Sequence, residues 1–276
     1  MKRLYCLFII ILCLAISIPS YAQFTIYGKH IIYDKQNDTY MACIPEDAFG
    51  KDYEAIILLD IASDWSDLSI DGTQIAYSYT FKQVEGNKLY SIHARKGNKE
   101  INTKITFTFL PLLVLQGSFG YDYAQGSMSL YSPDATEPTI SLIKAKWRGG
   151  STNTADKHKR NYKIKSINFK GKSQDISLLG MREDNNWIMD AGQIDLFRLR
   201  NRIATEIWND FATKPYYASK EPKAKSGVTG KVVEVILNNE YRGIYSLTEA
   251  MDRKELKLKK YDDKNQEFHG QLWKVS

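Results

Sequence analysis

The segment KAKWRGGSTNTADKHKRNYKIKS, residues 144–166, joins a glycine-rich turn to a run of alternating residue types. Tyr162 and Ile164 alternate with Lys163 and Lys165, so one face of this run is apolar and the other is cationic. A period of two residues predicts a β-strand that packs its apolar face against a core. The second half of the chain is therefore expected to contain a sheet.

The turn of this segment carries groups that recognise phosphate. A cation, two glycines that let the backbone approach a ligand closely, and two hydroxyls follow one another in the sequence. On chemistry alone, a glycine turn followed by a solvated basic strand is the better explanation, because charged strand faces are common. The candidate phosphate-binding residues are Arg148, Gly149, Gly150 and Ser151, with Lys163 and Lys165 on the strand that follows.

Downstream of this segment, the pattern predicts a helix and a hairpin. From Asp195, apolar residues with steps of three and four predict an amphipathic helix, with Arg198 and Arg202 on its opposite surface. Two short apolar runs, 232–237 and 244–247, predict a hairpin around Asn238-Asn239-Glu240. The apolar stripe of the helix consists of Leu196, Leu199, Ile203, Ile207 and Phe211.

Upstream of the segment, residues 24 to about 131 predict strands. Residues 105–109 alternate between apolar side chains and threonine, and glycine-containing turns separate the apolar runs, as in a β-sandwich. The expected fold class is α+β, a β-sandwich-like domain followed by a mixed α/β lobe. The expected boundaries are 23–131 for the β-sandwich-like domain, 132–138 for a linker and 139–276 for the second domain.

The N-terminus has the pattern of a secretory signal peptide. Lys2 and Arg3 precede an apolar run from Leu4 to Ile18, and Ser20-Tyr21-Ala22 offers a cleavage site before Gln23. The apolar run is shorter than the roughly 20 residues that span a bilayer, which disfavours a retained anchor. The protein is expected to be exported, to a periplasmic, cell-surface or secreted location, with no transmembrane segment in the mature chain.

Composition and charge exclude several classes of protein. With 43% hydrophobic and 25% charged residues among 276, the chain is neither disordered nor collagen-like nor a coiled coil. The formal net charge of +6 falls to +4 once Lys2 and Arg3 are removed, too little to predict nucleic-acid binding. Cys43 is the single cysteine after the leader, so no intrachain disulfide is expected.

Other motifs are incomplete. Gly171-Lys172-Ser173 resembles the end of a phosphate-binding loop, but Ser166 stands where that motif needs its first glycine. The four histidines have no metal-site spacing, and no G-x-S-x-G motif predicts a serine hydrolase. No metal ligands are therefore proposed from the sequence.

Five motifs in order resemble the spore coat protein H (CotH) kinase-like family. They cover about 110 residues, and one departure is Gly150, where the family usually has asparagine. The motifs are an R-G-N-S-S-type loop at Arg148–Thr152, K-x-x-Y-x-x-K at Lys159, Tyr162 and Lys165, L-L-G-M at Leu178–Met181 followed by D-x-x-W at Asp184–Trp187, an aspartate with an R-N pair at Asp195 and Arg200-Asn201, and a V-E-V-x-L-N-x-E-Y-x-G-x-Y-x-L-T-E hairpin at Val233–Glu249.

The resemblance implies an atypical protein kinase that transfers the γ-phosphoryl group of ATP, with Mg²⁺, to protein serine or threonine. It assigns the phosphate loop to Arg148–Thr152 and the strand lysine to Lys165 or Lys163. It places an adenine-binding hinge at Leu247-Thr248-Glu249, and Arg200 would clamp a phosphate or order the loop. A structural Arg200 and a capping Glu249 are the alternatives.

The family's catalytic and metal-binding aspartates lie well downstream of the hairpin. Asp252, Asp262 and Asp263 follow the hinge too closely to replace them, so the chain is expected to lack the catalytic lobe, and no catalytic residue or metal ligand is assigned. Apolar surface is then expected to be exposed around Ile244, Leu272 and Trp273.

Two classes of function remain open at this level. The first is a kinase-like protein that takes ATP and Mg²⁺ and a protein substrate. The second is a non-catalytic secreted or surface scaffold with a protein partner, for which the N-terminal domain would be the binding module. A polysaccharide-binding sandwich is the weakest alternative, because buried aromatics explain its Tyr and Trp residues equally well.

Overall fold

The structure is a computed structural model, and it forms two compact units, Met1–Phe109 and Leu110–Ser276. It describes residues 24–26, 29–59, 66–76, 78–154, 156–259, 261–267 and 272, so the expected leader at residues 1–22 lies outside the described residues. The division falls at Phe109, whereas a linker was expected at residues 132–138. That segment instead connects two strands within the second unit.

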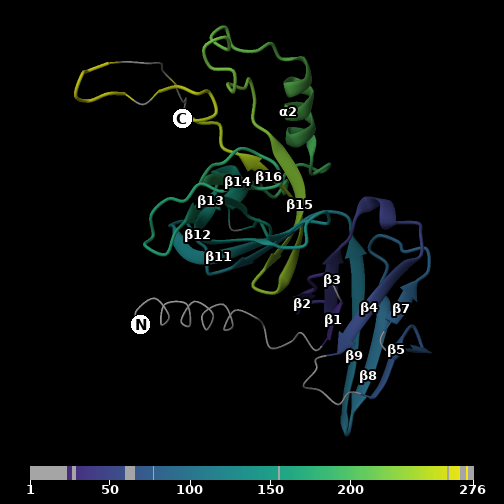
Figure 1. The fold of residues 1–276 in the computed structure, drawn as a ribbon. Coiled ribbons are helices and arrows are strands. Elements are labelled where there is room, and N and C mark those ends of the chain that lie inside the picture. The colour runs from purple at the N-terminus through teal and green to yellow at the C-terminus, as the bar shows by residue number, and fades with distance from the viewer. Residues whose placement is uncertain are drawn as a thin grey trace, which may run out of the picture. The chain divides into compact units, whose positions relative to one another are not determined.

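The first unit consists of two sheets that share one apolar core (Figure 1). A three-stranded sheet has the order β1-β4-β7, and a six-stranded sheet has the order β2-β3-β9-β8-β5-β6. Phe81 on β7 contacts Tyr90 and Phe107 of the other sheet edge-to-face, with ring centroids 4.8 and 4.9 Å apart. The strands are β1 (Phe24–Ile26), β2 (Ile32–Asp34), β3 (Thr39–Cys43), β4 (Tyr53–Leu59), β5 (Ser66–Ile70), β6 (Thr73–Gln74), β7 (Ser78–Phe81), β8 (Tyr90–Lys96) and β9 (Lys99–Thr108), with one 3₁₀ turn, η1 (Glu46–Ala48).

The second unit is a closed barrel of seven strands in the order β10-β11-β12-β13-β14-β16-β15. All neighbours are antiparallel except β10 and β15, whose parallel pairing closes the barrel. The elements are β10 (Leu112–Gln116), β11 (Ala124–Tyr131), β12 (Thr139–Arg148), η2 (Ser151–Asn153), β13 (Asn161–Ile167), β14 (Asn186–Asp190), α2 (Arg200–Phe211), β15 (Gly230–Leu237) and β16 (Glu240–Glu249).

The barrel interior is filled by the apolar side chains that alternate along its strands. Ile143 and Ala145 on β12, Ile164 on β13 and Trp187 on β14 are fully buried in one cluster. The lysines between them therefore project from the outer face. The predicted strand around residues 162–165 is thus confirmed, and its cationic face is the outside of the barrel.

The expectation of an α+β fold with a mixed α/β lobe is wrong. Strands predominate, and α2 is the one α-helix among the described residues. The physical reason is closure: a sheet that rolls into a barrel buries its apolar face on itself and needs no helix layer. None of the helices in the described part of the chain is long and apolar enough to cross a membrane.

The helix α2 buries a different face from the one that its amphipathic sequence pattern predicts. Its stripe residues Ile203, Ile207 and Phe211 are all more than half exposed, whereas Arg202 on the opposite surface is buried. Arg202 Nη2 donates to Val228 O at 3.3 Å, and its guanidinium lies against Gly230, where a side chain would collide with it. The polar side of the helix therefore faces the barrel.

The hairpin prediction is confirmed. Leu237 pairs with Glu240 at the end of β15 and β16, and Asn238 and Asn239 both have positive φ, as a tight two-residue turn requires. Of the residues expected to expose apolar surface, Ile244 on β16 is 39% exposed and Leu272 is 47% exposed, and Trp273 lies outside the described residues.

Candidate functional site

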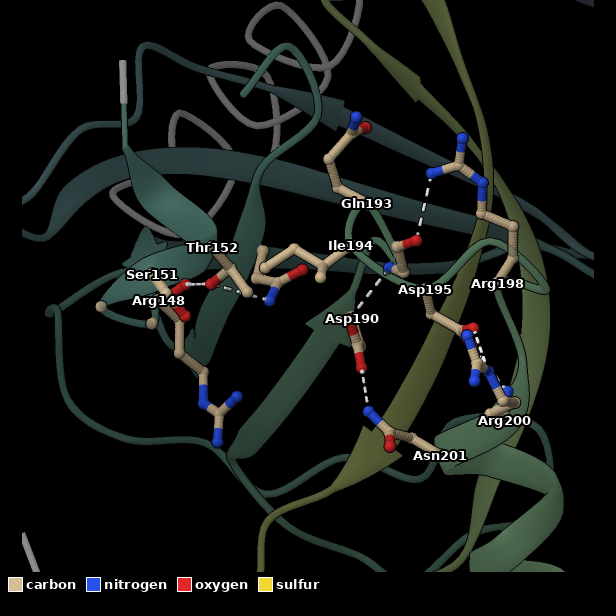
Figure 2. A pocket seen from close by; sticks show the side chains of 14 residues that line it. Arg148, Ser151, Thr152, Asp190, Gln193, Ile194, Asp195, Arg198, Arg200 and Asn201 are labelled. Atoms are coloured by element: carbon tan, nitrogen blue, oxygen red, sulfur yellow. Dashed lines mark hydrogen bonds and ion pairs between the residues drawn. The ribbon is translucent and has the colours of Figure 1, made fainter. Parts of the chain in front are cut away.

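A cleft of about 560 Å³ opens between the loop after β12, the end of β14 and the start of α2 (Figure 2). It brings together five of the residues singled out in the sequence, Arg148 to Ser151 and Arg200. Its lining consists of Arg148, Gly149, Gly150, Ser151, Thr152, Asn161, Asp190, Gly192, Gln193, Ile194, Asp195, Arg198, Arg200 and Asn201.

The loop from Arg148 to Thr152 is folded tightly by its first glycine. Gly149 has φ +102°, and a Cβ there would lie 2.0 Å from Thr152 Oγ1. Thr152 Oγ1 donates to Arg148 O at 3.4 Å and accepts from Asn161 Nδ2 at 3.3 Å, which ties the loop to β13. Only glycine fits at position 149, whereas a Cβ at Gly150 would meet open space.

Asn161 and Asp190 connect the strands to the segment before α2. Asn161 is buried, and its Oδ1 accepts from Ala191 N at 2.6 Å. Asp190 Oδ1 accepts from Gly192 N at 3.0 Å, and Asp190 Oδ2 accepts from Asn201 Nδ2 at 3.3 Å (Figure 2). Asn161 and Asp190 were missed as site residues. The available signal was Asp190 itself, an acidic residue that directly follows the apolar run Trp187–Met189.

The three arginines of the cleft differ in how they are held. Arg200 Nε lies 2.5 Å from Asp195 Oδ1, and Arg200 N donates to Asp195 Oδ2 at 2.9 Å. Arg198 Nη1 donates to Gly192 O at 3.1 Å. The side chain of Arg148 is exposed, and among the described residues its guanidinium has no hydrogen-bond or ion-pair partner; Figure 2 shows it extended away from the loop.

These contacts decide which charge is available to a ligand. Desolvation alone would raise the pKa of Asp195, but its hydrogen bonds with Arg200 and Phe197 hold the pKa below its ordinary value. Asp195 therefore stays ionised and neutralises Arg200, so Arg200 orders the start of α2. Arg148 remains as an uncompensated cation beside the glycine loop.

Three other predicted residues share the outer face of the barrel with the cleft, without lining it. Lys163 pairs across the strands with Lys146 on one side and with Ile188 on the other, and Ile188 pairs with Thr248. Lys165 lies one step further along β13, opposite Lys144. Because alternate residues of a strand are roughly 7 Å apart, Lys163 is about 7 Å and Lys165 about 14 Å along β13 from Asn161.

Glu249 is placed elsewhere, buried at one end of the barrel. Its carboxylate accepts from Arg182 N at 2.9 Å and from Thr229 N at 2.8 Å, and Lys225 Nζ lies 3.1 Å from both of its oxygens. Desolvation acts to raise the pKa of Glu249, but these donors hold it below the ordinary value. In this structure Glu249 joins three segments and does not line the cleft.

Lys159, which belongs to the K-x-x-Y-x-x-K motif, was not chosen as a site residue. Its Nζ donates to Ile244 O and lies 4.2 Å from the centroid of the Tyr245 ring. Burial, followed by repulsion from Arg198, lowers the pKa of Lys159 to about 8. This lysine holds β16 to the segment before β13, and the charges of Arg198 and Asp190, two residues of the cleft, act on its pKa.

The chemistry of the cleft is that of an anion site. The donors that phosphate oxygens can accept from are the guanidinium of Arg148, the backbone N–H groups of the glycine loop and the hydroxyl of Ser151. The described residues include no group of three potential ligands that could hold a metal ion by itself. Asp190 is a carboxylate of the cleft without an ion pair to the described cations, so it is the residue that fits a metal ion carried in by a phosphate ligand.

Comparison with known protein families gives a match to the part of the chain that contains the cleft. Residues 145–276 match the family model described as CotH kinase protein. The match begins on β12, so it contains the loop, the cleft and α2 and leaves out the first unit. No curated protein matches the chain.

Proposed function

Because residues 145–276 are CotH-like and kinase-related, we propose that the cleft beside Arg148 binds the phosphates of ATP. The chain would then be the nucleotide-binding part of an exported, CotH-type protein kinase-like protein that acts on protein serine or threonine. The observation that carries the proposal is the guanidinium of Arg148, which has no partner in the described parts of the chain, beside a loop that only glycine at position 149 can form.

A nucleotide whose phosphates lie at the Arg148 loop could extend across the outer face of the barrel, from β13 toward β16. Lys163 lies one step from the cleft along β13, and Thr248 lies two strands further in the same row. With the phosphates at the Arg148 loop, Lys163 is the strand lysine closer to them, and Thr248 is within the reach of the adenine end. The geometry favours Lys163 over Lys165 for the phosphate contact.

Magnesium fits this site as a companion of the nucleotide. ATP carries Mg²⁺ on its phosphates, and Asp190 is the carboxylate that would face such an ion. The chemistry that the ion supplies is neutralisation of phosphate charge, while Arg148, Lys163 and the loop hold and orient the phosphates. Arg200, fixed by Asp195, keeps the start of α2 in place beside them.

The test is thermal stabilisation of the purified mature chain by Mg-ATP. A ligand that binds the folded state stabilises it by about 2.7 kcal/mol at one hundred times its dissociation constant, which raises the melting temperature by several degrees. We expect a rise for the wild type, its loss in Arg148→Ala and Lys163→Gln, and its retention in Lys220→Gln, an exposed lysine elsewhere in the unit. No rise in the wild type contradicts the proposal.

A non-catalytic scaffold is the second candidate, and exposed apolar residues favour it. Leu196 is 89% and Phe197 is 76% exposed, in the segment that leads into α2. Such a surface is typical of a region that binds another protein. The scaffold predicts a folded protein whose melting temperature does not respond to Mg-ATP, so the same experiment separates the two candidates.

A further inference from the structure

Four lysines form a cationic patch on the outer face of the barrel. Lys144 on β12 pairs directly with Lys165 on β13, and Lys146 pairs directly with Lys163. We call these four residues the lysine face. Like charges directly opposite each other on neighbouring strands destabilise a sheet, so the arrangement is unfavourable for folding by itself.

For three of these four lysines, the described carboxylates do not compensate the charge. Lys144, Lys146 and Lys165 form no ion pair with any carboxylate in the described parts of the chain. Two of them instead share an aromatic ring: Lys146 Nζ lies 5.1 Å and Lys165 Nζ lies 4.7 Å from the centroid of Tyr123. The ring holds both side chains beside one another without neutralising either.

A neighbouring turn adds more positive charge. A Cβ at Gly171 would lie 3.9 Å from Lys144 Nζ, so the turn that contains Gly171 borders the lysine face. Lys170 and Lys172 flank this glycine and are exposed. The patch therefore continues past the end of β13, away from the cleft.

We propose that the lysine face binds an extended acidic segment of a protein, which reaches the cleft as the phosphoryl acceptor. The role of this segment as the phosphoryl acceptor rests on the proposed function. An extended peptide repeats its side chains on one side every roughly 7 Å, the same repeat as the lysines of each strand. Carboxylates at alternate positions of the peptide therefore meet successive lysines, and the chain continues toward Arg148 and the cleft.

The nucleotide that we propose for the cleft would not contact the Lys144–Lys165 pair. Phosphates held at the Arg148 loop engage Lys163, whereas the Lys144–Lys165 pair lies a further step along the strands. A lysine pair about 14 Å from the cleft is beyond the phosphates of a nucleotide held there. The far pair is therefore available to a second anion, and an acidic peptide matches both its charge and its spacing.

The experiment uses the purified mature chain and a fluorescent peptide of about ten residues that alternates aspartate and serine. A peptide with asparagine in place of aspartate is the matched probe. We expect the acidic peptide to bind, with weaker binding at higher salt, and the double variant Lys144→Gln/Lys165→Gln to bind about tenfold more weakly or worse. Lys214→Gln/Lys220→Gln removes the same charge from exposed positions after α2 and should bind like the wild type.

Three results would overturn the inference. Equal binding of the asparagine peptide, or unchanged binding by the Lys144→Gln/Lys165→Gln variant, means that the lysine face does not recognise acidic peptide. Binding to vesicles of anionic lipid that depends on these lysines, without peptide binding, assigns the face to a lipid surface instead. The Mg-ATP response of the same variant is measured separately, so failure of the nucleotide proposal is distinguished from failure of this one.

Discussion

Lys225 Nζ lies 3.1 Å from each carboxylate oxygen of Glu249, the last residue of β16. The same carboxylate accepts the backbone N–H groups of Arg182 and Thr229. A residue that the family resemblance assigns to a nucleotide hinge thus joins the segment before β14, the segment before β15 and the end of the barrel. Its capping role, the alternative left open by the sequence, is what the contacts support.

Glu249→Ala should destabilise the barrel by about 2–4 kcal/mol. The variant leaves two part-buried N–H groups and one lysine without their acceptor. Urea unfolding followed by tryptophan fluorescence measures this, because Trp187 lies in the barrel core. Glu183→Ala removes an exposed carboxylate nearby in the sequence and should change stability by less than about 0.5 kcal/mol. Equal effects of the two variants would contradict this role of Glu249.

Stability of the barrel should fall in acid. Burial opposes ionisation of Glu249 and Asp184, but hydrogen bonds lower both pKa values. Glu249 accepts from Arg182, Thr229 and Lys225. Asp184 accepts from Lys254 and Asn185. A carboxyl whose pKa is lowered in the folded state stabilises that state fully when the pH is above its ordinary pKa, which is 4.5 for Glu249. This stabilisation is lost as the pH falls through the pKa of the folded state.

Glu255 acts in the opposite sense. Burial and the neighbouring Glu249 raise its pKa, so its contribution favours folding at low pH and is lost as the pH rises through the raised value. Melting temperatures from pH 3 to pH 7, in steps of about one unit, should show acid destabilisation in the wild type. The Asp184→Asn/Glu249→Gln variant should show a flatter profile, and an unchanged slope would contradict this assignment.

Gly149→Ala should abolish nucleotide binding with little change in global stability. The new Cβ would lie 2.0 Å from Thr152 Oγ1 at a φ that alanine rarely adopts, so the loop must open. Gly150→Ala is the matched control, because a Cβ there meets open space. The Mg-ATP-dependent rise in melting temperature should be lost in the first variant and kept in the second. Loss in both variants would mean that any side chain in the loop blocks the ligand.

Lys144→Glu should stabilise the barrel while it removes acidic-peptide binding. The substitution turns a like-charge pair with Lys165 into an opposite-charge pair, which is worth about 0.2–1 kcal/mol. Denaturant unfolding and peptide anisotropy on the same protein give the two readouts. Lys220→Glu, at an exposed position, should change neither. A loss of stability in Lys144→Glu would show that the lysine pair is structural.

We expect the N-terminal leader to direct export and its removal to leave Gln23 as the first residue of the mature protein. The basic start, apolar run and Ser20-Tyr21-Ala22 are the features that a signal peptidase recognises. Intact mass and N-terminal sequencing of protein recovered from outside the cytoplasm measure the cleavage site. Replacing Ala22 with a bulky residue should leave the leader attached, and an unprocessed wild-type protein would contradict the prediction.

Features with a local cause could be predicted from the sequence. The alternation around Ile164 sets the strand and its two faces, the two asparagines set the turn of the last hairpin, and the glycine pair after Arg148 places a loop at the cleft. In each case the deciding interactions lie within a few residues of one another. Residue type and spacing therefore carry the information.

Features that depend on distant segments could not be predicted. The helix begins at Arg200 because Asp195, expected to open it, accepts from Arg200 N and pairs with the arginine side chain outside the helix. The cleft residues Asn161 and Asp190 acquire their role only when β13 and β14 end beside the same segment. The Phe109 boundary depends on β10 joining the barrel, which no local pattern indicates.

The parallel pairing of β10 with β15 also imposes an order on how the chain folds. Leu112 meets Glu234, and Leu115 meets Leu237, so closure joins segments more than a hundred residues apart. When the chain becomes available from its N-terminus, the first unit can fold early, while β10 keeps an unpaired edge until the β15–β16 hairpin is available. Barrel formation is then limited by the entropy of a long loop, and chaperones have their longest access to the protein in that interval.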